Sequence, residues 1–435
     1  MIDFARPYVV SWNLTYRCNL ACEHCYLDAG PKPQVGTQNF ADRSELGTEE
    51  CYKVIEEIAA FAPECLTILT GGEPLLRRDI LDIVRRAAER GLWVVVGTNG
   101  VRITENVAKH LAEAGARGLS LSLDALDPDR HDRFRNVRGA WQNTVDGAEI
   151  LNRTALPFIV QTTAGSHNVD ELEAIADFAY ERLFAKVWNL YFLVPTGRGQ
   201  FVSDMTPSQY DEVLGSLYRI QKKYAGRMLV NAKCAPHYIK TVLEKGDETH
   251  PIRTYSGGAG GCPAGTHYLG IRPNGDVTPC PYLPVFAGSL RQTSLTELWS
   301  ASDLFKSIRS RLSLGGRCGD CEMTLHCGGC RARAYGMTGD LMAEDPLCTH
   351  TPGTFADSPL LVLRRPTVQY GSESPSTIAW DDDAAERMKR IPAFVRGMVT
   401  RAVEDTCRKN GSSRVTVEEL EKIRARMPTP KFFST

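Results

Sequence analysis

Short apolar runs alternate with amphipathic segments over about the first 195 residues of the chain. The runs are rich in β-branched and aromatic residues and have the length of buried strands. They occupy residues 8–14, 65–70, 92–98, 118–124, 158–163 and 186–194. Between them, segments such as TEECYKVIEEIAAFA and DILDIVRRAAERG are apolar every three to four residues, which is typical of helices that cover a sheet. The pattern therefore predicts six βα units.

Six such units predict an α/β fold on a parallel sheet, because each helix must cover the sheet face beside its strand. A closed (β/α)8 barrel needs eight units. We therefore expect an open or partial (β/α)6 barrel.

The pattern changes after the sixth unit. Residues 206–245 read as helices, and the next hundred residues turn to Gly, Cys and short strands with an Asn-Gly turn. A stretch rich in Pro, Ser and Thr follows, and then two or three short helices that break at Ile391-Pro392 and at KNGSS. The predicted units are a barrel, a helical bridge, a cysteine-rich domain, a linker and a small helical domain, over residues 1–205, 206–254, 255–350, 351–379 and 380–435.

Composition narrows the possible partners. The chain has 435 residues, of which 43% are hydrophobic, so it can bury a sizeable core. Lys plus Arg number 51 against 52 for Asp plus Glu, which gives no argument for nucleic acid or an anionic membrane. The N-terminus lacks a signal-peptide pattern and no run of 18 apolar residues occurs, so we expect a cytoplasmic protein without a membrane span.

The chain has 14 cysteines, which a reducing compartment would not keep as disulfides. Metal binding, catalysis or burial remain. The cysteines form two dense groups, CxxxCxxC near the N-terminus and paired CxxC motifs after residue 317. Cys51, Cys65 and Cys407 stand alone, and we interpret them as small buried hydrophobes.

The first group is Cys18, Cys22 and Cys25, on the loop that follows the first predicted strand. Three thiolates can bind three irons of a 4Fe-4S cube and leave the fourth iron open for a substrate or cosubstrate. The alternative is a zinc site that His24 or a distant residue completes.

This motif, one strand ahead of TGGEP at residues 70–74, resembles the radical S-adenosylmethionine (radical SAM) enzymes. The resemblance implies a partial (β/α)6 barrel, a 4Fe-4S cluster and S-adenosylmethionine (AdoMet) chelated to the open iron. It also implies a reductant such as flavodoxin or ferredoxin, and a 5'-deoxyadenosyl radical that abstracts hydrogen from a substrate.

The resemblance implies roles for residues at the strand ends. Gly71 and Gly72 would let backbone approach the methionyl amine, in a turn shaped by Glu73 and Pro74. A Gly-Gly-acid-Pro sequence is also an ordinary strand-to-helix turn. Ribose or carboxylate contacts are implied for Thr98, Asn99, Ser122 and Asp124, although TNG is also a common turn.

Two further residues are implied to contact AdoMet. His24 occupies a position where the family usually has an aromatic side chain against the adenine. Arg198, in VPTGRG past the sixth strand, could pair with the carboxylate, and a solvated loop arginine is the alternative.

The second cysteine group resembles the SPASM extension of radical SAM enzymes, which carries auxiliary 4Fe-4S clusters. The pattern departs from the family in having two residues between the last two cysteines of CGDCEMTLHCGGC. By resemblance, one cluster is ligated by Cys318, Cys321, Cys327 and Cys348, and a second by Cys262, Cys280 and Cys330.

The second auxiliary cluster lacks a fourth ligand in this set. Cys234 is the candidate, and an open iron is the alternative; we interpret the nearby His237 as structural. A zinc-ribbon site, which would only stabilise the fold, is a further alternative for the CxxC pairs.

Two resemblances indicate the class of substrate. NLYFLVPTGRG and the CGGCRARAYGMTGDLMAEDPLC segment are similar to the tetrapyrrole-modifying branch of SPASM enzymes, which acts in the heme d1 and alternative heme routes. Trp380, IPAFVR, Glu404 and Gly411 resemble a small C-terminal domain of light-independent protochlorophyllide reductase, although a generic helical appendage would look alike.

We therefore expect a radical enzyme that removes a carboxylate-bearing side-chain group from a tetrapyrrole. A SPASM peptide maturase is the alternative; the early first cysteine leaves no room for an N-terminal peptide-recruiting domain, although some maturases use a separate protein for that. A multi-cluster electron carrier or zinc scaffold could use the same cysteines but would not need GGEP.

Overall fold

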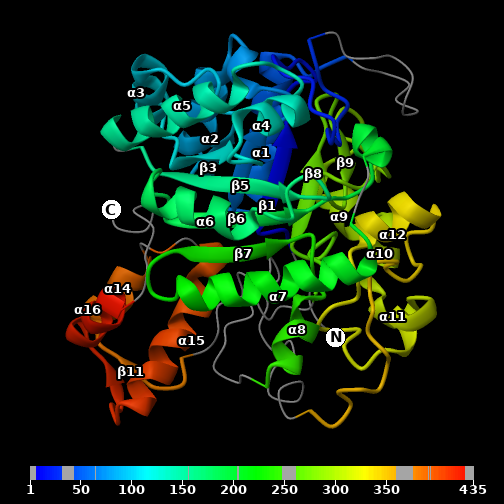
Figure 1. The fold of residues 1–435 in the computed structure, drawn as a ribbon. Coiled ribbons are helices and arrows are strands. Elements are labelled where there is room, and N and C mark those ends of the chain that lie inside the picture. Colours follow the sequence, from blue (N-terminus) through cyan, green and yellow to red (C-terminus); the bar gives the residue numbers. More distant parts are fainter. Residues whose placement is uncertain are drawn as a thin grey trace.

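The computed structural model of the chain is drawn in Figure 1. It describes residues 6–31, 44–63, 65–154, 156–202, 205–246, 261–358, 376–389, 391 and 393–426. Pro392 of the predicted helix break, most of the predicted linker and the junction between the predicted bridge and cysteine-rich domain lie outside these residues.

The six predicted strands are confirmed as parallel neighbours in one sheet, each paired with the next along the chain. They are β1 (Val9–Asn13), β2 (Leu66–Thr70), β3 (Trp93–Gly97), β4 (Gly118–Ser122), β5 (Phe158–Ala164) and β6 (Val187–Phe192). Because the strand order follows the chain order, each crossover helix moves the chain one strand further in the same direction.

Helices connect these strands, as the amphipathic segments predict. They are α1 (Thr48–Phe61), α2 (Ile80–Glu89), α3 (Glu105–Glu113), α4 (Pro128–Arg135), α5 (Ala140–Thr154) and α6 (Leu172–Glu181). The alternation of side chains along β2 separates two environments: Leu69 lies in the hydrophobic core, whereas Ile68 and Thr70 line a cavity. The inner face of the sheet is therefore free to build a site.

The sheet is larger than predicted. Between α7 (Pro207–Lys223) and α8 (Tyr238–Glu244) lies β7 (Leu229–Lys233), which the sequence did not predict and which pairs parallel with β6. At the opposite side, β8 (Tyr268–Ile271) pairs parallel with β1. The cysteine-rich segment thus continues the sheet of the barrel instead of standing beside it.

An antiparallel ribbon completes this side of the sheet. β9 (Asp276–Thr278) pairs with β8 across the predicted Asn-Gly turn, where Gly275 has a φ of +91°. β10 (Gly288–Ser289) pairs with β9, so the whole order is β10-β9-β8-β1-β2-β3-β4-β5-β6-β7. The ten strands form an open sheet, in agreement with a partial barrel.

Helices follow the ribbon. They are α9 (Leu295–Ala301), α10 (Asp303–Arg309), α11 (Gly316–Asp320) and α12 (Arg331–Thr338). Among the described helices, none combines the length and the hydropathy needed to cross a bilayer.

The predicted C-terminal helices are also present, grouped in orange and red in Figure 1. They are α14 (Asp382–Lys389), α15 (Ala393–Lys409) and α16 (Val417–Arg426), with β11 (Ala379–Trp380) paired to β12 (Arg414–Val415). Glu404, 1% exposed, accepts hydrogen bonds from the Trp380 indole at 2.9 Å and the Thr377 backbone at 3.1 Å. These hydrogen bonds thus attach α15 to the short parallel sheet of β11 and β12.

Candidate active site and metal centres

The loop after β1 carries the first cysteine group, and hydrogen bonds join the two ends of this loop. The backbone N–H of Cys18 donates to Gly30 O at 3.1 Å, and the N–H of Gly30 donates to Tyr16 O at 3.2 Å. All three side chains, Cys18, Cys22 and Cys25, line one cavity at the carboxyl ends of the strands. This is the end at which parallel α/β folds place their ligands.

Each of the three sulfurs also receives a nitrogen donor. Leu20 N lies 3.4 Å from the Sγ of Cys18, Ala29 N lies 3.3 Å from the Sγ of Cys25, and the Arg135 guanidinium lies 3.7 Å from the Sγ of Cys22. Donors of this kind stabilise sulfur that carries negative charge.

The donor set can hold an iron-sulfur cluster. Burial, together with the neighbouring Cys22 and Cys25, raises the pKa of Cys18 to about 12, so a thiolate at Cys18 needs a cation beside it. No fourth cysteine lines the cavity among the described residues, which suits a cube with one open iron.

The GGEP turn packs directly against the start of this loop. Gly72 N donates to Thr15 O at 2.7 Å, and Glu73 N donates to Arg17 O at 2.8 Å. A Cβ on Gly72 would lie 2.2 Å from Arg17 O, and Gly71 has a φ of +134°. Both glycines also line the cavity. Their first physical role is therefore to let β2 approach the cysteine loop, and the predicted AdoMet contact stays a prediction.

Glu73 does not line the cavity, but its carboxylate holds residues that do. The carboxylate accepts from the Thr98 hydroxyl at 2.9 Å, from Asn99 N at 2.9 Å and from Leu75 N at 3.0 Å. Leu75 belongs to the short 3-10 helix that Pro74 begins. Burial raises the pKa of Glu73 to about 7 against the effect of these donors.

The residues that Glu73 holds do reach the cavity. Thr98 and Asn99 both line it, and the Asn99 amide donates to Asn19 Oδ1 at 2.9 Å and approaches the Sγ of Cys18 at 3.8 Å. Asn99 thus connects the end of β3 to the cysteine loop. Whether Thr98 and Asn99 contact AdoMet stays a prediction.

Asp124 and Ser122 lie in different settings. Ser122 lines the cavity at the end of β4, whereas Asp124 is fully buried and paired with Arg135, whose Nε donates to it at 2.7 Å. Although burial opposes it, Arg135 holds the pKa of Asp124 down at about 2. Asp124 therefore serves first to orient Arg135, which lines the cavity and which the sequence analysis missed.

His24 lines the cavity and stacks on Phe134, with ring centroids 4.2 Å apart and 4° between the planes. Phe134 in turn stacks on His167 at 3.8 Å. Burial lowers the pKa of His24 to about 3, so the ring is neutral. The structure agrees with a stacking surface at this position, and the contact with adenine stays a prediction.

Arg198 lines the cavity from the 3-10 helix η2 (Gly197–Phe201), where it holds the cysteine loop. It donates to Asp28 Oδ1 at 2.8 Å, to Cys22 O at 3.0 Å and to Ala29 O at 2.8 Å. A loop arginine in solvent is thereby ruled out. Its predicted carboxylate contact is untested.

Several further residues line the cavity that the sequence analysis did not single out. They are Ser11, Gln161, Thr163, Tyr191, Tyr268 and Tyr282. Gln161 and Thr163 could have been found, because they are polar, lie two residues apart on β5 and so share one face of the sheet. The tyrosines could not, because β6, β8 and the segment after β9 meet only in the folded chain.

The second cysteine group separates into two cavities, and the first of these includes Cys234. It is lined by Cys234, Cys262, Cys280 and Cys330. The thiol of Cys330 is close enough to those of Cys234 and Cys262 to interact with both by hydrogen bonding. The fold thus brings the candidate fourth cysteine to the other three, as a closed 4Fe-4S site requires, and its ligation stays a prediction.

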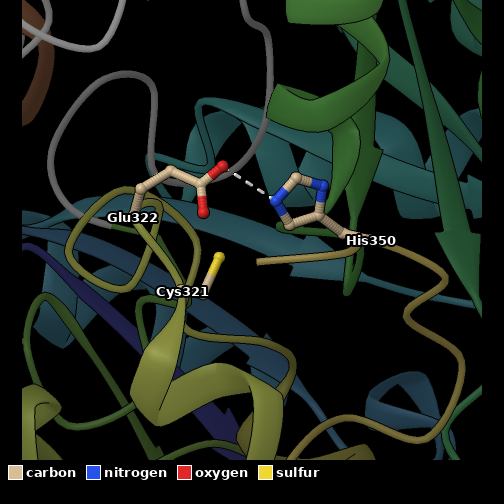
Figure 2. A group of neighbouring side chains, drawn as sticks. All are labelled: Cys321, Glu322 and His350. Carbon is tan, nitrogen blue, oxygen red and sulfur yellow. Dashed lines mark hydrogen bonds and ion pairs between the residues drawn. The ribbon is translucent and has the colours of Figure 1, made fainter. Parts of the chain in front are cut away.

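The second cavity is lined by Cys318, Cys321, Cys327 and Cys348, the four cysteines that the resemblance groups together. Cys321 also lies with Glu322 and His350 in a group whose ligand atoms are within 4.8 Å of one another, shown in Figure 2. Glu322 is already occupied, because it accepts from Gly353 N at 2.7 Å and from the His350 ring at 3.0 Å. Cys321 therefore remains available to the four-cysteine site, and its ligation stays a prediction.

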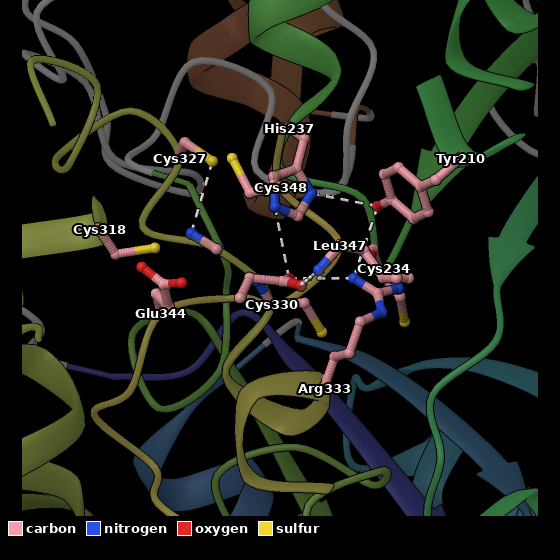
Figure 3. A network of polar contacts seen from close by, with 12 residues as sticks. Tyr210, Cys234, His237, Cys318, Cys327, Cys330, Arg333, Glu344, Leu347 and Cys348 are labelled. Atoms are coloured by element: carbon pink, nitrogen blue, oxygen red, sulfur yellow. Dashed lines mark hydrogen bonds and ion pairs between the residues drawn. The ribbon is translucent and has the colours of Figure 1, made fainter. Parts of the chain in front are cut away.

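A buried polar network lies between the two four-cysteine cavities (Figure 3). Asp345 and Arg333 form an ion pair at 3.0 Å with both side chains fully buried. Asp345 also accepts from Cys330 N at 2.8 Å, and Arg333 donates to Cys234 O at 3.0 Å. Both contacts reach backbone of the Cys234 site.

The same network reaches the other cavity through His237, which lines it and lies 3.4 Å from Asp345. Tyr210 from α7 contacts the other ring nitrogen of His237 at 3.1 Å. His237 thus has structural contacts, in line with its interpretation from sequence.

Comparison with known proteins explains this arrangement. Residues 12–179 match the family described as Radical SAM superfamily, and residues 262–322 match the SPASM iron-sulfur cluster-binding domain. A protein of Methanosarcina barkeri named AdoMet-dependent heme synthase is 36% identical over 352 residues, which cover 80% of this chain and 97% of that protein. The chain belongs to the radical SAM superfamily.

Membership fixes the cofactors. A radical SAM enzyme with a SPASM domain uses 4Fe-4S clusters and AdoMet, and the three cysteine sets described above are where this chain can hold the clusters. Residues 380–424 separately match a family described as Proto-chlorophyllide reductase 57 kD subunit, which agrees with the resemblance of the C-terminal helices.

Other radical SAM relatives differ in their named products. Pre-heme d1 synthase of Dinoroseobacter shibae is 30% identical, covering 82% of this chain and 90% of that protein. PqqA peptide cyclase of Rhizobium meliloti is 28% identical, covering 80% and 88%. The crystal structure of Streptococcus suis SuiB bound to S-adenosylmethionine shares the fold, with a TM-score of 0.62 at 18% identity over 80% of this chain and 78% of that one.

Proposed function

We propose that this radical SAM enzyme oxidises a tetrapyrrole by removing a carboxylate-bearing side-chain group. The observation that carries the proposal is the 36% identity to AdoMet-dependent heme synthase over 97% of that protein, with the three cysteine sets in place. Pre-heme d1 synthase among the relatives supports the same substrate class.

When bound, the cluster and AdoMet supply a 5'-deoxyadenosyl radical that takes a hydrogen atom from the substrate. The chain's own residues position this chemistry. Arg198 and Asn99 fix the cysteine loop, Glu73 fixes the ends of β2 and β3, and Arg135 places a guanidinium beside Cys22. We assign the AdoMet contacts to the predicted residues that line the cavity, which are His24, Gly71, Gly72, Thr98, Asn99, Ser122 and Arg198. Glu73, Pro74 and Asp124 do not line it, so we assign them a supporting role.

The proposed reaction balances as follows for a propionate side chain. The hydrogen atom leaves the carbon next to the ring, CO2 is released, an alkene remains and one electron is left over. A one-electron acceptor must therefore lie near the substrate. The cavity lined by Cys234, Cys262, Cys280 and Cys330 shares part of its wall with the AdoMet cavity, so an auxiliary cluster held there would lie close to the substrate.

The remaining assignments belong to the same proposal. We assign the Cys234 set and the Cys348 set as ligands of two auxiliary 4Fe-4S clusters, and retain the five predicted units as its domains. A flavodoxin or ferredoxin would supply the electron for AdoMet cleavage, without nucleic acid or membrane as a partner. We also propose a cytoplasmic location, because cysteines that ligate clusters or stay reduced suit a reducing compartment.

A peptide maturase is the second candidate, since PqqA peptide cyclase is 28% identical. A non-catalytic electron carrier, the further alternative from sequence, does not agree with membership in a superfamily whose relatives are named as synthases.

The proposal is tested with anaerobically reconstituted protein, AdoMet and a reductant. We expect iron coproporphyrin III to raise the rate of 5'-deoxyadenosine formation and to lose mass as CO2. A short peptide serves as the comparison. Stimulation by peptides alone would overturn the substrate class, and absence of any AdoMet cleavage in protein with full iron would overturn the enzyme.

A further inference from the structure

The AdoMet cavity and the Cys234 cavity share a wall of three tyrosines, Tyr191, Tyr268 and Tyr282, which line both. Tyr191 comes from β6, and Tyr268 begins β8. Tyr282 follows Cys280 by two residues. The wall therefore forms only where the barrel strands meet the cysteine-rich segment.

The rings of this wall support one another. The ring centroid of Tyr282 lies 4.6 Å from that of Tyr26 and 6.3 Å from that of Tyr191, with interplanar angles of 53° and 47°. Tyr26 directly follows Cys25, and its hydroxyl donates to Asn13 at 2.7 Å. Tyr282 follows Cys280 of one cysteine site and packs between Tyr26, next to Cys25 of the other, and Tyr191 on β6, which fixes its position.

The tyrosine wall is flanked by apolar residues of the cavity lining. Phe192 and Leu193 follow Tyr191 along the chain, and Pro281 precedes Tyr282. Polar groups also reach the wall, because Thr163 pairs with Tyr191 across the sheet and the Gln161 amide donates to the Tyr191 hydroxyl at 3.4 Å. A flat ring system with an apolar face suits the apolar residues around Tyr282.

The arginines that line the AdoMet cavity are already paired with carboxylates. The guanidinium groups that line the AdoMet cavity among the described residues are Arg135 and Arg198, and each is paired with a buried carboxylate, Asp124 or Asp28. Recognition of a tetrapyrrole at this wall therefore rests on its ring faces, because the nearby cations already have partners.

We propose that Tyr282, held by Tyr26 and Tyr191, is the surface on which the conjugated rings of the substrate pack. This inference rests on the proposed function and adds the residue that selects a planar macrocycle over an extended peptide. The edge of the substrate is then directed toward Cys18, Cys22 and Cys25 in the AdoMet cavity. The face of its rings lies against the tyrosine wall that this cavity shares with the Cys234 cavity.

The test measures binding of iron coproporphyrin III by the shift of its Soret absorption, anaerobically and with AdoMet present. We expect Tyr282→Ala to weaken binding about tenfold or more, because stacking on one aromatic ring contributes on the order of 1–3 kcal/mol. Tyr282→Phe keeps the ring and should bind within about threefold of the native protein. AdoMet affinity should be the same in all three proteins.

The outcomes separate the inference from the proposed function. Equal binding by the native protein and Tyr282→Ala would overturn the tyrosine surface but leave the tetrapyrrole substrate standing. Failure of the native protein to bind iron coproporphyrin III would overturn the function itself. If Tyr282→Ala loses iron from the nearby cysteine site, Tyr282→Leu decides the matter, because leucine fills much of the same space without an aromatic ring; unchanged affinity in that variant contradicts the inference.

Discussion

Arg135 and Arg198 show how single residues fix the cysteine loop. Each pairs with a buried aspartate and also contacts Cys22, one at its sulfur and the other at its carbonyl oxygen. Sequence could identify Arg198 by its motif, but it could not show that the guanidinium is held by three acceptors of the loop. Arg135 lies on α4, far from any motif, and becomes visible only when Asp124 is placed beside it.

At the same scale, Gly72→Ala is expected to disrupt the cysteine loop. The new Cβ would lie 2.2 Å from Arg17 O, which is backbone and cannot move without shifting the loop. We predict a protein that loses iron from the first site, as measured by iron content and AdoMet binding.

The matched control for that substitution is Gly91→Ala. Gly91 has a φ of +78° but nothing within 4 Å of a Cβ, so this variant should cost only about 1 kcal/mol of strain and keep its iron. Equal iron content in both variants would contradict the close approach assigned to Gly72.

Elements were predicted unevenly. The six strands of the barrel were found because each has a strongly apolar run, and the C-terminal helices because of their periodicity and breaks. β7 was missed because LVNAK is short and lies between two helices. The parallel pairing of β8 with β1 could not be predicted from local patterns, because about 250 residues of chain separate the two strands.

The Asp345 network connects the two auxiliary cysteine sites, and it is built by residues from several elements. Asp345→Ala would leave the buried Arg333 guanidinium without its partner, which costs about 3–5 kcal/mol. It would also leave Cys330 N without an acceptor. We predict that iron content falls toward that of one cluster, while the first site, far along the chain at Cys18, keeps its own.

Glu421→Ala provides the control. Its ion pair with Arg387 joins two C-terminal helices, and the two side chains are 62% and 46% exposed, so its loss should cost at most about 1 kcal/mol. Iron counting and thermal unfolding of both variants measure the difference, and an equal loss in the two would refute the role assigned to the Asp345 network.

For the whole molecule, buried histidines set the response of stability to acid. Burial lowers the pKa of His131, His237 and His267 to about 4 each, below their unfolded value near 6.5. The unfolded state therefore binds more protons in this range, and stability falls as the pH drops below about 6.5. Glu73 acts in the opposite sense, because its pKa is raised to about 7 and its contribution is lost as the pH rises.

The two effects can be compared between pH 7.5 and 5.5. These three histidines and His24, whose pKa burial lowers to about 3, together cost about 5 kcal/mol and Glu73 returns about 2 kcal/mol, so we predict a net loss of about 3 kcal/mol on acidification. Anaerobic thermal unfolding of the cluster-containing protein measures it. His131→Gln should flatten the dependence; an unfolding temperature that rises as the pH falls would contradict these ionisation states.

The most direct test of the account follows the abstracted hydrogen. Iron coproporphyrin III with deuterated propionate side chains is incubated anaerobically with AdoMet, reductant and the reconstituted enzyme, and 5'-deoxyadenosine is analysed by mass spectrometry. We predict one deuterium in 5'-deoxyadenosine for each CO2 released, and none when Cys18, Cys22 and Cys25 are all replaced by alanine. Release of CO2 with unlabelled 5'-deoxyadenosine, or unchanged turnover in the cysteine variant, would contradict the account.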